Sequence, residues 1–168
     1  AKIGLEPASI SGEESLVAEL LGALTMTEVD TTRFFRALMA VTPTALPASG
    51  LPPVLFGAFY TPDRLPERFV QRLRSWLVDW AARLCADGVG ETMRHARMAA
   101  ANPWIIPRNY LLQEAINAAT EGDLKPLGQL MSAIQDPYTE RPDFERFTAL
   151  RPDWARHAPG CSALSCSS

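Results

Sequence analysis

The 168-residue sequence has few cysteines, no long apolar run and no concentration of charge of one sign. Cys85, Cys161 and Cys166 are too few and too unevenly spaced for a disulfide framework, so we expect a reducing compartment, the cytoplasm. No apolar stretch approaches the roughly 18–20 residues that a membrane span needs. The net charge is −3 and no basic stripe is visible, which argues against nucleic acid as a partner.

The usual signatures of enzyme sites are missing too. Gly88-Val89-Gly90 lacks the third glycine of a dinucleotide loop and follows a helical pattern instead of a strand. The two histidines, His95 and His157, stand in no cluster with ligand spacing, so we expect no metal site. Activation of the Cys166 thiol by His157 stays open as a distant alternative, although no third, orienting group is evident.

The first residues contain no secretory signal, because a charged region followed by an apolar run and a cleavage site is absent. The chain also begins with Ala1 instead of Met. We therefore expect a piece of a longer protein.

Apolar residues recur at steps of three and four along most of the chain, the spacing of amphipathic helices. No segment alternates apolar and polar residues as a strand would. The sequence predicts an all-α fold, an irregular bundle of about six helices. The predicted helices cover about 11–24, 31–39, 66–86, 91–101, 108–120 and 123–134, with short helical turns at 143–150 and 153–156.

Prolines interrupt this pattern between residues 42 and 62. The same stretch carries large apolar residues, which favours a long connection packed onto the helices over a partly disordered loop. We expect one helical domain over 1–157, with the Pro-rich connection inside it. Residues 158–168 are small and polar, and we expect them to form a mobile C-terminal tail.

The segment from Asn102 to Asn109 combines a helix end with polar residues at the next helix start. Asn102-Pro103 ends one helix, because the residue before proline is pushed out of the α region. Arg108 and Asn109 stand at the next start, where they can bond either a neighbouring loop or a ligand. Bonding to a neighbouring loop is the commoner use of such groups, so we favour a structural role.

Several segments occur in an order that resembles the C-terminal end of the selenoprotein O family. Two lie early in the chain, and a larger set lies between residue 102 and the last four residues. These segments are Lys2-Ile3-Gly4-Leu5, the helix 30–38, Asn102-Pro103 with Arg108-Asn109, 115–119, Gly122-Asp123, Asp136-Pro137-Tyr138, Pro152-Asp153-Trp154 and Ser165-Cys166-Ser167-Ser168.

The resemblance implies more than the residues themselves show. Members of this family have a kinase-like fold and transfer AMP from ATP, with Mg or Mn, onto hydroxyl side chains of proteins. Their catalytic residues belong to a core that precedes the region matched here. The chain is thus expected to be the C-terminal helical part of a larger kinase-like protein, without catalytic or cofactor-binding residues of its own. Its expected partners are that N-terminal core and, for the whole protein, the protein substrates.

One residue role follows from the resemblance. The third position from the end, Cys166 here, is selenocysteine or cysteine in the family, and it is implied to form a regulatory disulfide with a cysteine of the core. A thiol on a mobile tail can exchange readily. Ala163 stands where some members carry a second cysteine. Cys161 lies five residues before Cys166 instead, so a looser Cys161–Cys166 bridge stays open.

A stand-alone helical interaction module with an inert Cys166 is the alternative. Such a module would bury its apolar residues fully. A piece of a larger protein would leave an apolar face exposed where the rest of the protein packs.

Overall fold

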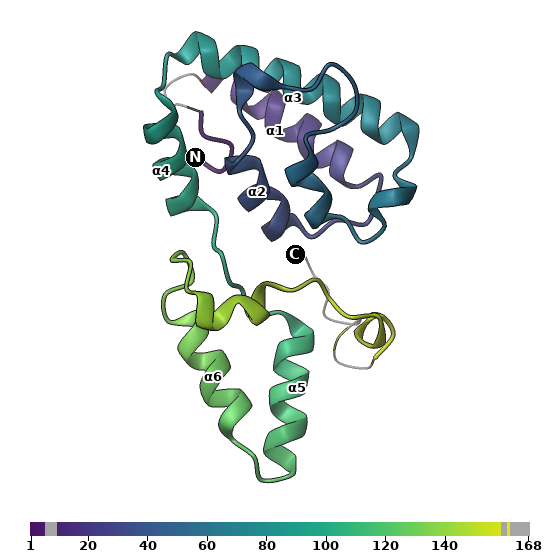
Figure 1. Ribbon diagram of the computed structural model, residues 1–168, viewed down its shortest axis with the longest axis vertical. Helices are drawn as coiled ribbons and strands as arrows, with labels where there is room; N and C mark the ends of the chain where they lie inside the picture. Colours follow the sequence, from purple (N-terminus) through teal and green to yellow (C-terminus); the bar gives the residue numbers. More distant parts are fainter. Residues whose placement is uncertain (6–9, 159–160, 162–168) are drawn as a thin grey trace. The chain divides into compact units, whose positions relative to one another are not determined.

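The computed structural model describes residues 1–5, 10–158 and 161, and the side chains of residues 10–14 lie outside this description. Figure 1 shows an all-helical chain. Within the described part, the only β pairing is an isolated antiparallel bridge between Val29 and Phe59. The α-helices are α1 (Ile10–Leu24), α2 (Thr31–Met39), α3 (Glu67–Asp87), α4 (Glu91–Ala101), α5 (Asn109–Thr120) and α6 (Lys125–Ile134). The prediction of an all-α fold is confirmed.

The chain divides into two compact units, residues 1–102 and 103–168, where the sequence predicted a single helical domain over 1–157. The boundary falls at Asn102-Pro103, the dipeptide predicted to end a helix. Asn102 has the extended φ and ψ of −116° and 104°, and α4 ends one residue before it. Proline sterics thus explain the end of α4, and the boundary between the two units falls at the same dipeptide.

Aromatic side chains form the centre of the first unit, in which α1 lies along α3 and α2 packs on α4 (Figure 1). Phe59 lies between Phe34 and Phe69, with ring centroids 6.4 and 5.4 Å away. Trp76 and Trp80, one turn apart on α3, stack with centroids 5.8 Å apart. Burying residues of this size supplies most of the driving force for folding such a unit.

The helix ends follow local rules. Asp30 caps α2, where its side chain accepts a 2.9 Å hydrogen bond from the Arg33 backbone N–H. Gly88 ends α3 in the left-handed conformation, with φ of +66°. At α6 the cap position is occupied by Leu124, and Asp123, one residue earlier, accepts from the Lys125 N–H at 3.0 Å.

The Pro-rich stretch 42–62 is packed down, as predicted, and forms short 3-10 helices. Its buried residues are Leu51, Pro52, Leu55, Ala58 and Phe59. The stretch contains η1 (Pro43–Ala45), η2 (Pro53–Ala58) and the start of η3 (Pro62–Arg64). Proline at the first position of each suits a turn whose first N–H groups have no internal partner.

The second unit is a helical hairpin of α5 and α6 joined by the turn at Gly122, whose φ is +89° (Figure 1). The 3-10 helices η4 (Pro142–Thr148) and η5 (Asp153–Arg156) follow it. The Pro137 carbonyl accepts hydrogen bonds from the backbone N–H groups of Trp104 and Ile105, at 2.6 and 3.1 Å. These bonds fasten the segment before α5 to the turn after α6.

Candidate functional site

Buried polar groups gather around the first five residues, which enter the core of the first unit. Ile3 and Leu5 are 2% and 0% exposed. An extended segment at that depth carries backbone groups that need partners, because an unpaired buried carbonyl is costly. The indole N–H of Trp80 donates to the Ile3 carbonyl at 2.8 Å, across 77 positions of sequence.

Asn102 supplies the second attachment. Its side-chain amide donates to the Lys2 carbonyl at 2.9 Å, and its own carbonyl accepts from the Arg36 guanidinium at 3.1 Å. Its backbone N–H bonds the Met98 carbonyl and closes α4. Asn102, which is 1% exposed, therefore joins the first residues through its side chain to α2 and α4 through its backbone.

Arg94, which the sequence analysis did not single out, is the most buried cation of the first unit, at 2% exposure. Its guanidinium donates to the carbonyls of Met39 and Val41, both at 3.3 Å, and lies over the Trp80 ring at 5.7 Å. Burial lowers the pKa of Arg94 from its ordinary value, and the carboxylate of Glu91, 3.6 Å away, opposes that shift.

Gly4 shows how closely these groups fit. Its φ is +81°, and a Cβ placed there would lie 2.7 Å from Arg94 Cγ and 3.1 Å from Met98 Sδ. Only glycine tolerates both the left-handed backbone and this approach. The cluster of Gly4, Trp80, Arg94 and Asn102, named here the N-terminal clasp, thus holds residues 1–5 by shape and by hydrogen bonds. Most of its hydrogen bonds go to backbone carbonyls, which is typical of a structural cluster.

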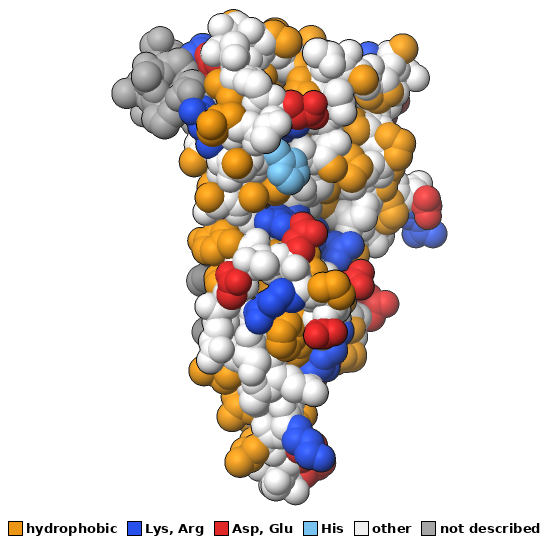
Figure 2. Space-filling view, turned by 60° about the vertical axis from the view of Figure 1, so that its left-hand side comes forward, with side chains coloured by type: hydrophobic (Ala, Val, Ile, Leu, Met, Phe, Trp, Pro, Cys, Tyr) orange, Lys and Arg blue, Asp and Glu red, His pale blue; other side chains and the backbone are white. Residues whose placement is uncertain are grey.

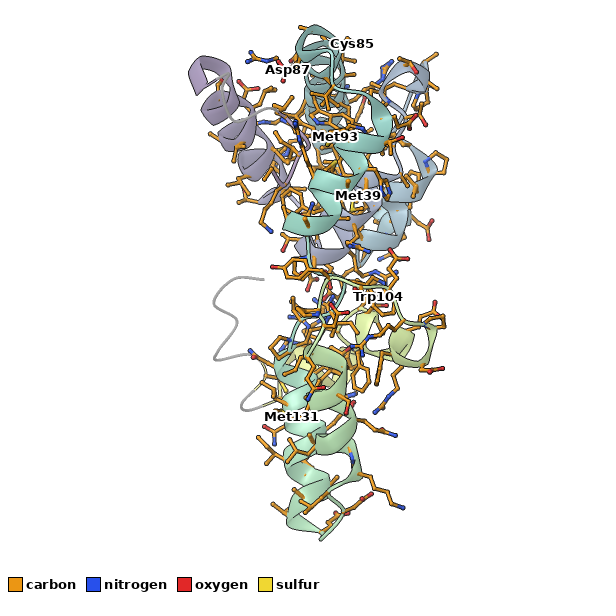
Figure 3. The ribbon with its side chains drawn as sticks, turned by 90° about the vertical axis from the view of Figure 1, so that its left-hand side faces the viewer. Met39, Cys85, Asp87, Met93, Trp104 and Met131 are labelled. Carbon is orange, nitrogen blue, oxygen red and sulfur yellow. The ribbon has the colours of Figure 1, made fainter. Side chains whose placement is uncertain are left out.

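A cavity of about 330 Å³ opens beside Arg94. Its lining includes the threonines Thr42 and Thr44 from the Pro-rich stretch, Cys85 near the end of α3, and Glu91. Figure 3 shows Cys85 at that end of α3 and Met93 on the neighbouring α4. Among the described residues, the groups that line the cavity belong to no set of three or more His, Cys, Asp or Glu side chains that could hold a metal ion.

The Arg108-Asn109 pair lies in the second unit, apart from Asn102 in the first. Arg108 is the N-cap residue of α5 and is 9% exposed, and Asn109 is the first residue of the helix and is half-buried. The next residue also bonds a loop from this helix start. The Tyr110 hydroxyl donates to the Ala149 carbonyl at 3.0 Å. In the sequence, only the position of Tyr110 next to the Arg108-Asn109 pair pointed to this hydrogen bond.

The cysteines lie in different surroundings. Cys85 is exposed, whereas Cys161 is 3% exposed within the apolar cluster of the second unit, and both are free thiols. Of the tail 158–168, which was expected to be mobile, the structure describes only Ala158 and Cys161. Cys166 lies outside the described residues. His157 is exposed, and so is His95.

The comparison with protein families decides the identity of the chain. The model of the family described as "Protein adenylyltransferase SelO" matches residues 1–135, which include the N-terminal clasp and the hairpin of α5 and α6. The chain belongs to the SelO family.

Curated relatives agree with this assignment. The chain is 45% identical over 92% of its length to a protein nucleotidyltransferase YdiU of Methylobacillus flagellatus. It is 38% identical over its whole length to one of Nitrosospira multiformis, and 41% identical to one of Xanthomonas campestris. It covers 29%, 34% and 31% of these proteins. The chain therefore spans about a third of the SelO-family relatives that it matches.

Within residues 1–5, 10–158 and 161, no group of three or more His, Cys, Asp or Glu side chains is placed to hold a metal ion. Among the described helices, none combines the length and the apolar character needed to cross a membrane.

Proposed function

We propose that this chain is the C-terminal helical scaffold of a SelO-family protein adenylyltransferase. The whole protein transfers AMP from ATP to hydroxyl side chains of other proteins. The observation that carries the proposal is the family match over residues 1–135 in a chain that covers only about a third of its relatives. ATP and Mg or Mn bind outside these 168 residues, in the kinase-like core.

The contribution of this part is structural. The N-terminal clasp fixes residues 1–5 in the core of the first unit through the Ile3 and Lys2 carbonyls. A segment that joins a preceding core would enter the helical unit at this point, and its direction would be set by these bonds. The free thiols of Cys85 and Cys161 support a cytoplasmic location, where thiols stay reduced.

A transfer assay with ATP labelled on its α-phosphate tests the proposal. We expect the full-length product of the parent gene to label a generic protein acceptor with AMP. The 168-residue chain alone should neither label the acceptor nor bind ATP tightly. A full-length protein that transfers the γ-phosphate instead, or AMP transfer by the isolated chain, would refute it.

We further propose that Cys166 is a redox latch that pairs with a cysteine of the core. In the full-length protein, Cys166→Ser should abolish the dependence of AMP transfer on added dithiothreitol. Cys85→Ser is the matched control and should leave that dependence unchanged. Intact-mass analysis under non-reducing conditions identifies the partner, and retained redox dependence in Cys166→Ser would exclude the latch.

The stand-alone interaction module is the alternative function. It is weakened by the apolar side chains that remain exposed on α5 and α6, because a self-contained module would bury them.

A further inference from the structure

Exposed apolar side chains concentrate on the hairpin of α5 and α6. Ile116 is 55% exposed and Leu112 38% on α5, and Met131 is 51% and Leu127 40% on α6. Leu124, at the cap position of α6, is 64% exposed. These five residues are named here the hairpin face. In Figure 2 apolar side chains line the left-hand edge of the hairpin, and Figure 3 shows Met131 on its outer side.

Helical geometry places the two stripes of the hairpin face on one side. Three of the five exposed residues follow a buried one: Leu112 follows Leu111, Ile116 follows Ala115, and Met131 follows Leu130. One residue is a rotation of about 100° around a helix axis.

The two helices run antiparallel (Figure 1). On each helix, the residue that follows an inward-facing residue therefore points to the same side of the hairpin. The stripes thus form one continuous surface beside the buried seam.

The apolar composition of the hairpin face indicates what kind of surface its partner must offer. All five side chains are uncharged and apolar, while Glu114, two residues from Ile116 and about 200° around the axis, is exposed on the opposite side. An occupant must therefore offer an apolar surface of its own. Side chains of this size, together on one side, are more than the scattered apolar residues of an ordinary surface.

The length of the family's proteins indicates where the occupant lies. The chain covers 29–34% of its first relatives, and the family match extends to residue 135, one residue beyond α6. The hairpin face is thus part of the region shared with the family, in proteins about three times as long. We infer that the hairpin face docks on the part of the same polypeptide that lies outside these 168 residues. This inference rests on the proposed function.

Cysteine labelling tests the inference in a background with Cys85→Ser and Cys166→Ser. Ile116→Cys reports on the hairpin face, and Glu114→Cys, on the opposite side of α5, is the matched control. Both are placed in the 168-residue chain and in the full-length protein. We expect Ile116→Cys to react at least about tenfold more slowly in the full-length protein than in the short chain, because docking must open first. Glu114→Cys should react at similar rates in both.

Leu127→Cys on α6 provides a second reporter and should be protected in the same way. Equal labelling of the face in both proteins would overturn the inference, as would equal protection of Glu114→Cys. Protection in the short chain that disappears on dilution would assign the face to a second copy and overturn it as well. The AMP-transfer assay is independent of these rates, so failure of the proposed function and failure of docking are distinguishable.

Discussion

Replacement of Gly4 by alanine should destabilise the first unit more than the same change at Gly88. Both glycines have positive φ, +81° and +66°. A Cβ at Gly88 would meet nothing within 4 Å, whereas one at Gly4 would lie 2.7 Å from Arg94 Cγ. Comparing the two variants therefore separates the cost of left-handed backbone, which both share, from the cost of overpacking, which only Gly4→Ala has.

The magnitudes follow from these contacts. Left-handed backbone costs an alanine about 1–2 kcal/mol, and the lower entropy of the unfolded chain returns about 0.4–1 kcal/mol. Gly88→Ala should thus cost about 1 kcal/mol. Gly4→Ala adds overpacking of about 1–3 kcal/mol. Arg94 Cγ cannot easily move away, because its guanidinium is bonded to the carbonyls of Met39 and Val41.

Urea unfolding of the whole chain measures the free energy of each variant. Tryptophans lie in both units, so hydrogen exchange in α3 and α4 should be recorded alongside fluorescence to report on the first unit alone. We expect Gly4→Ala to lose about 1–3 kcal/mol more than Gly88→Ala. Equal losses for the two variants would show that residues 1–5 are not packed against Arg94 as described.

Two other predictions concern single side chains. Asn102→Ala removes a buried amide donor and should lower the free energy of unfolding by about 1–3 kcal/mol. Hydrogen exchange at the C-terminal end of α4 should become faster. A loss below about 0.5 kcal/mol would contradict the role of this side chain. With a thiol reagent and peptide mapping, exposed Cys85 should react about 100-fold faster than buried Cys161 in the native chain. Similar rates would contradict the burial of Cys161.

The sequence was sufficient for the features that depend on neighbouring residues. Asp30 caps a helix through an N–H three residues away, and Gly88 ends one through its own φ. Asn102-Pro103 ends α4 through a clash between adjacent residues. Each of these is decided within one turn of the chain, and apolar periodicity, which is equally local, predicted the six α-helices of the described residues.

The N-terminal clasp could not be predicted in the same way. It joins Ile3 to Trp80 and Lys2 to Asn102, across 77 and 100 positions. Arg94 and Arg97 lie on the same short helix, α4. Their spacing in the sequence does not show which of the two side chains is buried in the core. Such pairings are set by how the helices pack, and single-sequence periodicity gives only the face of each helix.

The burial of Cys161 bears on the partner of the proposed latch. Disulfide exchange requires a thiolate that another sulfur can approach, and a thiol that is 3% exposed within an apolar cluster reacts only after local opening. A Cys161–Cys166 bridge would therefore have to disrupt packing against residues such as Phe147, which is 2% exposed in the same cluster. A cysteine of the proposed kinase-like core would carry no such cost from this unit, so we expect Cys166 to pair outside the 168 residues.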